Sequence, residues 1–145
     1  YKYQRYHENL KYRGIREQGE YVVNSSYDPE SGYEAMNKIF KLRDIPTAVI
    51  AINDFAASGI IRSIREHKLH IPEDISIVSF DNTYLTYPKL TSIDYDYGHY
   101  GEILINTAIA AANGEKPPTF QTIEPRLVVR ESSGPCRKQV GTVRL

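Results

Sequence analysis

The sequence predicts an α/β protein with an open, mainly parallel sheet and helices on both faces. Two short runs rich in Val and Ile, 48–52 and 75–80, are apolar without polar alternation, which is typical of strands covered on both sides. Between them, apolar residues recur with a period near 3.6, which predicts a helix. This strand, helix, strand unit should have a right-handed crossover, and we expect the other elements to be arranged around it.

Ahead of this unit we expect a helix, a short strand and a second helix. Apolar positions at helical spacing predict the first helix over 3–12, with Gly14 as its stop. A short strand is predicted over 21–23. The second helix should begin at Pro29, which needs no N–H partner there, with the Asp28 side chain as its cap.

Within the central unit, Asp54 stands where a helix cap belongs, and the helix is predicted to reach 66 or 67. After the second strand comes a polar loop over 82–91 that contains a proline. This loop is too long for a tight turn, so we expect it to have a role. A further short strand is predicted around 92–94.

The last third is predicted to form a long helix followed by strand-like runs. Seven residues share one face of that helix: Tyr97, Tyr100, Ile103, Leu104, Thr107, Ala108 and Ala111. Asn113 and Gly114 should end the helix. The runs at 119–123 and 127–129 are strand-like. The segment 134–145 is short, basic and without period, which predicts a disordered tail.

Composition narrows the classes of function. The 18 Lys and Arg residues balance 18 Asp and Glu residues, which disfavours contact of this chain with a polyanion such as DNA. The longest apolar run, about six residues, is far shorter than the roughly 20 that a membrane helix needs, so we expect no membrane partner. The single cysteine, Cys136, excludes an internal disulfide and is expected to have no role, which suits a reducing cytoplasm.

The sequence predicts neither a metal centre nor a catalytic cluster. The four histidines have no spacing with acidic or cysteine partners that is typical of a zinc site. The chain also lacks a Gly-x-Ser-x-Gly elbow, a glycine-rich phosphate loop and a His-Glu-x-x-His pattern. We therefore expect no catalytic residue, no metal and no cofactor.

Each strand of the central unit ends in a polar pair. Asn53 and Asp54 follow the first strand, while Asp81 and Asn82 follow the second. The carboxyl ends of parallel strands form the ligand crevice of open α/β sheets, so these pairs stand where a ligand would bind. A carboxylate accepts hydrogen bonds from two hydroxyls, and an amide both donates and accepts. Asp54 is largely explained as a cap, whereas no helix follows Asp81, which makes Asp81 the stronger ligand candidate.

Four segments, taken in order, resemble a known family. Their sequences are Pro-Thr-Ala-Val leading to Asn-Asp (46–54), Ile-Pro-Glu-Asp-Ile-Ser-Ile-Val with Phe-Asp (71–81), Leu-Thr-Ser-Ile (90–93) and Arg-Leu-Val-Val-Arg-Glu-Ser (126–132). Together they are similar to the effector-binding core of the lactose/galactose repressor (LacI/GalR) family of bacterial transcription regulators. The resemblance covers nearly all of the chain to residue 133. It implies a type I periplasmic-binding-protein-like fold with an incomplete second lobe.

The resemblance implies effector-binding residues by position: Lys2, Tyr27, Asn53, Asp81 and Tyr95. Lys2 stands where the family has an arginine, and because a lysine lacks the planar guanidinium fork, the class of effector is in question there. An aromatic ring such as Tyr27 or Tyr95 offers a flat apolar face to the C–H groups of a sugar. The implied partner is a small sugar-like effector.

A homodimer interface is implied in the same way. In the family, dimers form largely through this lobe, which here implicates Ser58, Ile61, Arg62, Tyr87 and Leu90. Residues 1–133 would be the C-terminal part of an effector-binding and dimerisation domain, with the segment near 93–114 returning to the first lobe. By this resemblance, we expect the chain to lack the family's helix-turn-helix headpiece, its hinge helix, its first subdomain and the first strand of its second lobe. Operator DNA would therefore be bound only through a headpiece that the chain lacks.

These features bear on three functions from different classes. We predict the effector-sensing and dimerising module of a cytoplasmic transcription repressor. The alternative is a periplasmic sugar-binding protein of an ABC transporter, which a signal peptide upstream would indicate. A free enzyme is disfavoured by the missing phosphate loop. Because only one wall of a two-walled cleft is present, we expect the isolated chain to bind no DNA and to bind effector weakly or not at all.

Overall fold

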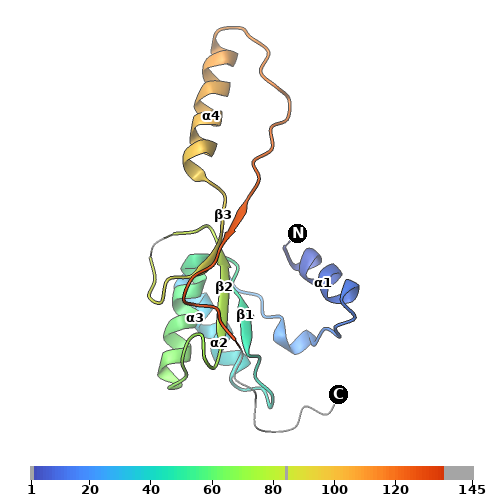
Figure 1. Ribbon diagram of the computed structural model, residues 1–145, viewed down its shortest axis with the longest axis vertical. Coiled ribbons are helices and arrows are strands. Elements are labelled where there is room, and N and C mark those ends of the chain that lie inside the picture. Colours follow the sequence, from blue (N-terminus) through green and yellow to red (C-terminus); the bar gives the residue numbers. More distant parts are fainter. Residues whose placement is uncertain (1, 84, 136–145) are drawn as a thin grey trace.

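The structure of the chain is a computed structural model that describes residues 2–83 and 85–135 (Figure 1). Its elements in chain order are α1 (Lys2–Tyr12), a 3-10 helix η1 (Gly19–Tyr21), α2 (Pro29–Ile39), β1 (Ala48–Ile50), α3 (Asp54–Glu66), β2 (Ser76–Phe80), β3 (Thr91–Asp94), α4 (Tyr97–Ala112) and β4 (Arg126–Val128). The expected helices are all present. The predicted cap of the second helix is confirmed as well, because the Asp28 side chain accepts a hydrogen bond from the Ser31 amide and Pro29 is the first helical residue.

The four strands form one open sheet in the order β1-β2-β3-β4. β1 pairs with β2 in parallel, with Val49 opposite Ile77, and β2 pairs with β3 in parallel. β4 is antiparallel to β3, with Ile93 opposite Leu127, because the chain returns along β3 after α4. This confirms the predicted mainly parallel α/β sheet.

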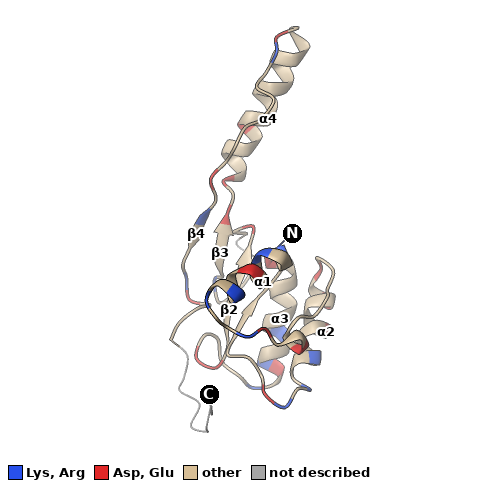
Figure 2. Ribbon diagram, turned by 90° about the vertical axis from the view of Figure 1, so that its right-hand side faces the viewer, with Lys and Arg blue, Asp and Glu red and all other residues tan. Residues whose placement is uncertain are grey.

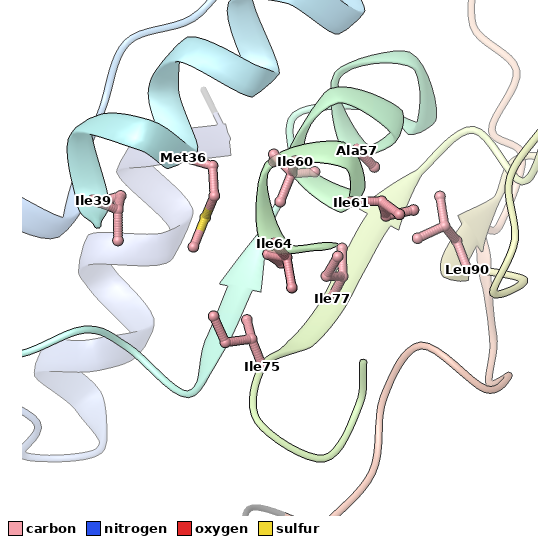
Figure 3. Packing of buried hydrophobic residues seen from close by; sticks show 10 residues of the cluster. Met36, Ile39, Ala57, Ile60, Ile61, Ile64, Ile75, Ile77 and Leu90 are labelled. Atoms are coloured by element: carbon pink, nitrogen blue, oxygen red, sulfur yellow. The ribbon is translucent and has the colours of Figure 1, made fainter. Parts of the chain in front are cut away.

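Ten buried apolar residues make the core between α2, α3 and the sheet (Figure 3). They are Met36, Ile39, Ala51, Ala57, Ile60, Ile61, Ile64, Ile75, Ile77 and Leu90. α2 and α3 pack directly on each other, and α3 contacts β2. Figure 1 shows α3 and α1 on opposite sides of β1 and β2, so helices flank both faces of this part of the sheet.

α4 stands away from this core (Figures 1 and 2). None of its residues is buried, and Leu104, Ile105 and Ile109 are all more than half exposed. The prediction of a helix here is confirmed. On the predicted apolar face, Tyr97, Tyr100 and Leu104 are exposed, while Ile103 and Thr107 are half-buried.

Two strand predictions are wrong. The chain at 21–23 ends a turn of 3-10 helix and continues extended, and its local anchor is the Tyr21 hydroxyl, which donates to the Asp44 carbonyl at 2.9 Å. The run 119–123 is also not a strand. β-Propensity forms a strand only where a neighbouring strand supplies hydrogen-bond partners, and neither segment is paired into the four-stranded sheet.

The closing segment of the chain is tied into the sheet by Ser132. Its hydroxyl is fully buried, accepts from the Thr91 amide at 2.8 Å and donates to the Ile77 carbonyl at 2.6 Å. The Ile77 amide donates in turn to the Ser132 carbonyl at 2.7 Å. These hydrogen bonds lie at the amino-terminal ends of the strands, opposite the edge at which a ligand is expected. Of the predicted tail, only Gly134 and Pro135 are among the described residues. The rest of the tail, which includes Cys136, lies outside them.

Candidate ligand-binding site

The carboxyl ends of β1, β2 and β3 lie at one edge of the sheet because the three strands are parallel neighbours. Asn53 follows β1, Asp81 follows β2 and Tyr95 follows β3, so topology brings these three predicted residues to the same edge. β4 starts at this edge too, where Arg126 forms an ion pair with the Asp94 carboxylate at 2.8 Å. The edge is therefore rich in polar and charged side chains.

Lys2 reaches this edge from the first turn of α1. Its ammonium group donates to the Ile52 carbonyl at 2.8 Å and lies 3.9 Å from the centre of the Phe80 ring. Burial lowers the pKa of Lys2, and the charge of Asp81 partly offsets this effect. The Lys2 ammonium group is therefore held between a carbonyl and an aromatic face, close to the Asp81 carboxylate.

Asp81 is the centre of a small polar and aromatic group. The Tyr97 hydroxyl donates to its Oδ1 at 3.2 Å, and the rings of Tyr95 and Tyr97 are 6.0 Å apart, tilted by 55°. Burial raises the pKa of both tyrosines, and the nearby Asp81 charge raises it further. The backbone of Asp81 has a φ of 98°, a conformation that costs a non-glycine residue energy.

Tyr97 was missed by sequence reasoning, which placed it on the apolar face of the last helix. A signal was present, because Tyr97 begins α4 just beyond the end of β3 and so lies at the carboxyl edge of the sheet. Its exposed fraction is 54%, so its ring is open to solvent beside Asp81.

Asn53 caps α3 and holds Tyr27 in place. Its Oδ1 accepts from the Ala56 amide at 2.8 Å, and its Nδ2 donates to the Tyr27 carbonyl at 3.1 Å. The cap of α3 is therefore Asn53, which corrects the prediction that Asp54 has this role. Asn53 is only 8% exposed, whereas Tyr27 is 68% exposed and presents its ring to solvent. The structure thus groups Tyr27 with Asn53, and Lys2 with Asp81 and Tyr95.

The residues predicted for a dimer interface are not all on the surface. Ile61 and Leu90 are 4% and 2% exposed and belong to the core, which corrects the prediction for these two side chains. Arg62 is exposed, but it pairs with Glu30 at 2.9 Å and lies over the Tyr33 ring. Ser58 is partly buried and Tyr87 is 79% exposed. Ile61 lies on the buried side of α3, directly before the exposed Arg62.

Neither a metal cluster nor a membrane span is found in the part of the chain that the structure describes. Over residues 2–83 and 85–135, histidine, cysteine and acidic side chains do not gather in threes as a metal site requires. No helix in those same ranges combines the length and the hydropathy needed to cross a bilayer.

Changing Asp81 to Asn should lower the pKa of Tyr97 towards its ordinary value. The Asp81 charge and hydrogen bond oppose ionisation of the Tyr97 hydroxyl, and the substitution removes that charge while keeping the size of the side chain. The check is a pH titration of the Tyr97 ring carbon signal by NMR. Asp44→Asn, an exposed residue at the other end of the sheet, should leave that titration unchanged. An unchanged Tyr97 titration in Asp81→Asn would contradict the contact.

An open, mainly parallel sheet with aromatic, acidic and basic side chains at its carboxyl edge has the architecture in which α/β domains commonly bind small molecules. The chain belongs to the family of periplasmic binding protein-like domains, whose description matches residues 2–133. Within that family it corresponds to the C-terminal, effector-binding portion of LacI-type transcriptional regulators, which confirms the resemblance seen in the sequence.

Two relatives and two solved structures illustrate this similarity. The chain is 33% identical over 136 residues to the HTH-type transcriptional repressor PurR of Mannheimia succiniciproducens, and 37% identical over 124 residues to PurR of Pasteurella multocida. These matches cover 90% and 82% of this chain. The chain spans only 40% and 37% of the two relatives, about two fifths of their length.

The solved structures show the same relation. A LacI-family sugar-binding transcriptional regulator from Escherichia coli, complexed with phosphate, superposes with a TM-score of 0.78 at 25% identity. The transcriptional regulator CelR in complex with cellobiose gives 0.79 at 26% identity. Each match covers 88% of this chain, and 47% and 40% of the two neighbours respectively.

Proposed function

We propose that this chain is the effector-sensing module of a LacI-type transcription regulator, and that its effector is a small molecule with several hydroxyl groups, such as a sugar. The observation that carries the proposal is the group formed by Lys2, Asp81 and Tyr97 at the carboxyl edge of the sheet. Cation, carboxylate and phenol lie together there, beside parallel strand ends, where α/β sheets bind ligands.

The chemistry of the edge suits a polyol. The Asp81 carboxylate has acceptor positions for a pair of ligand hydroxyls, and the Lys2 ammonium can donate to a hydroxyl or ring oxygen. The exposed ring of Tyr27 offers a flat apolar surface for the C–H face of a sugar ring. A neighbour of the same fold was solved with cellobiose, a disaccharide, which supports this class of ligand.

The proposed role is regulatory rather than catalytic. In this scheme, effector binding favours one arrangement of the sensing domain, and that preference changes how a separate DNA-binding part fits its operator, which is a coupling between two sites. We also propose pairing of two copies through the surface that carries Ser58, Arg62 and Tyr87. A regulator of this kind would act in the cytoplasm, where the chromosome is.

The coding sequence upstream of this chain separates the regulator from the periplasmic alternative. A helix-turn-helix there supports the regulator, while a secretory signal peptide supports a transport protein. This test needs no ligand.

The ligand is tested by NMR titration of the ¹⁵N-labelled chain with a panel of sugars, sugar phosphates and purines. NMR detects weak binding, which matters because we expect this chain to supply one wall of a two-walled site. The expected result is a saturable shift confined to amides near Lys2, Asn53, Asp81 and Tyr97. Saturable shifts centred elsewhere, or none across the panel, would refute the assignment of the site.

A further inference from the structure

We propose that Asp54 and Ser92 are positioning residues, which hold the turn at 81–83, and with it the Asp81 side chain, in the geometry used for binding. This inference rests on the proposed function for its consequence, but its structural part is independent of any ligand. Asp54 is fully buried and is not placed to touch a ligand, so the direct role of the edge residues does not account for it.

Each oxygen of the Asp54 carboxylate accepts two hydrogen bonds. Oδ1 accepts from the hydroxyls of Ser79 and of Ser92, the latter at 3.0 Å. Oδ2 accepts from the amide of Thr83 at 2.5 Å and from its hydroxyl at 2.9 Å. One side chain at the start of α3 therefore ties together β2, β3 and the turn after β2. A buried carboxylate is retained at such a position only where its acceptor positions are filled.

Ser92 links the Asp54 carboxylate to Asn82, the residue of the turn that precedes Thr83. While its hydroxyl donates to Asp54, its oxygen accepts from the Asn82 amide at 3.0 Å. From the other side, Arg130 donates to the Asn82 side-chain oxygen at 2.5 Å. The amides of Asn82 and Thr83 are thus each held, directly or through Ser92, by the Asp54 carboxylate.

The turn needs such restraints because its backbone is unfavourable. Asp81 and Asn82 have φ angles of 98° and 52°, where L-residues are uncommon. Residues persist in these conformations only where the surrounding structure imposes them. If the restraint is removed, the turn is free to relax to negative φ, and the Asp81 carboxylate then moves away from the Tyr97 hydroxyl and from Lys2.

The test compares two serine-to-alanine variants in the full chain. Ser92→Ala removes the link to Asn82. Ser63→Ala is the matched control, because Ser63 is also fully buried and hydrogen-bonded, at 2.9 Å to Asn37, but lies away from the turn. Asp54→Ala is the stronger variant. If it does not fold, Ser92→Ala still decides the question.

Three readouts are expected to change in Ser92→Ala and not in Ser63→Ala. Hydrogen exchange at the Asn82 and Thr83 amides should accelerate by about tenfold or more, since local opening loses its restraint. The Tyr97 pKa should fall, because Asp81 is no longer held beside it. The affinity for the ligand found in the panel should drop by about tenfold, the effect of losing one well-placed hydrogen bond to a charged group.

Two results would overturn the inference. One is a Ser92→Ala protein whose exchange rates and Tyr97 pKa match those of Ser63→Ala, because the turn would then hold without Asp54 and Ser92. The other is a turn that loosens while ligand affinity is unchanged. If no member of the panel binds the unmodified chain, the proposed function fails, and exchange together with the Tyr97 pKa still decides how the turn is held.

Discussion

Replacing Gly59 by alanine is expected to destabilise the chain by roughly 3 kcal/mol or more, a large part of the stability of a small domain. A Cβ at Gly59 would lie 1.7 Å from the Pro29 carbonyl oxygen and 2.8 Å from the Tyr33 amide nitrogen. Both atoms belong to the backbone of α2, so no side-chain rotation relieves the overlap. The two helices would have to separate and uncover the core between them (Figure 3). Urea unfolding followed by circular dichroism measures the loss.

Gly101→Ala is the matched control for this prediction. Gly101 is also a helical glycine, within α4, but a Cβ there meets nothing within 4 Å. Alanine is favoured over glycine in a helix by about 1 kcal/mol, so this variant should strengthen α4. Slower amide exchange along α4 would report the gain. If both glycine variants gave the same change in urea midpoint, close approach of α2 and α3 would not be the cause.

Replacing Asp81 by glycine is expected to weaken ligand binding about a hundredfold, because two hydrogen bonds to a charged group are lost, together roughly 3 kcal/mol. The same change should alter stability by less than about 1 kcal/mol. At a φ of 98°, the aspartate backbone is strained by an amount of order 1 kcal/mol, which glycine does not incur, and this gain offsets the freedom that glycine adds to the unfolded chain. A large loss of binding without a comparable loss of stability is expected where a functional residue is held under strain.

Asp44→Gly separates this effect from a general loss of an acidic residue. Asp44 is exposed and precedes β1, at the end of the sheet away from Asp81. Its replacement should leave ligand affinity within about twofold and lower stability slightly, because glycine adds freedom to the unfolded chain. NMR titration gives the affinities and thermal unfolding the stabilities. Equal affinity losses in the two variants would remove Asp81 from the site.

The location of the candidate site at one edge of the sheet could be predicted from the sequence because strand ends can be located without a structure. Asn53 and Asp81 directly follow apolar runs, and parallel pairing then brings them to one edge. The distribution of roles between neighbours could not be predicted. Asn53 and Asp54 are adjacent, and either suits a helix cap by residue type. In the structure, Asn53 makes the capping hydrogen bond. The Asp54 side chain is buried and accepts hydrogen bonds from Ser79, Ser92 and Thr83.

Local pattern was sufficient for the helices, the three parallel strands and the family, since periodicity, caps and breaking residues act within a few positions of the chain. Local pattern gave wrong predictions where strand formation or burial depends on residues far away in the chain. The segments 21–23 and 119–123 have strand-like residues but are not paired into the sheet. Ile61 and Leu90 are core residues only because α3 and the end of the 82–90 loop meet over β2.

The position of Tyr97 beside Asp81 and of Lys2 over Phe80 was likewise decided by tertiary structure alone. These contacts join residues far apart in the chain, and their distances follow from how whole elements pack. The sequence therefore determined which elements form and which strand ends carry polar residues. Packing decided which of those side chains are buried and which are exposed at the carboxyl edge, because burial and contact are properties of the assembled layers and not of any single segment.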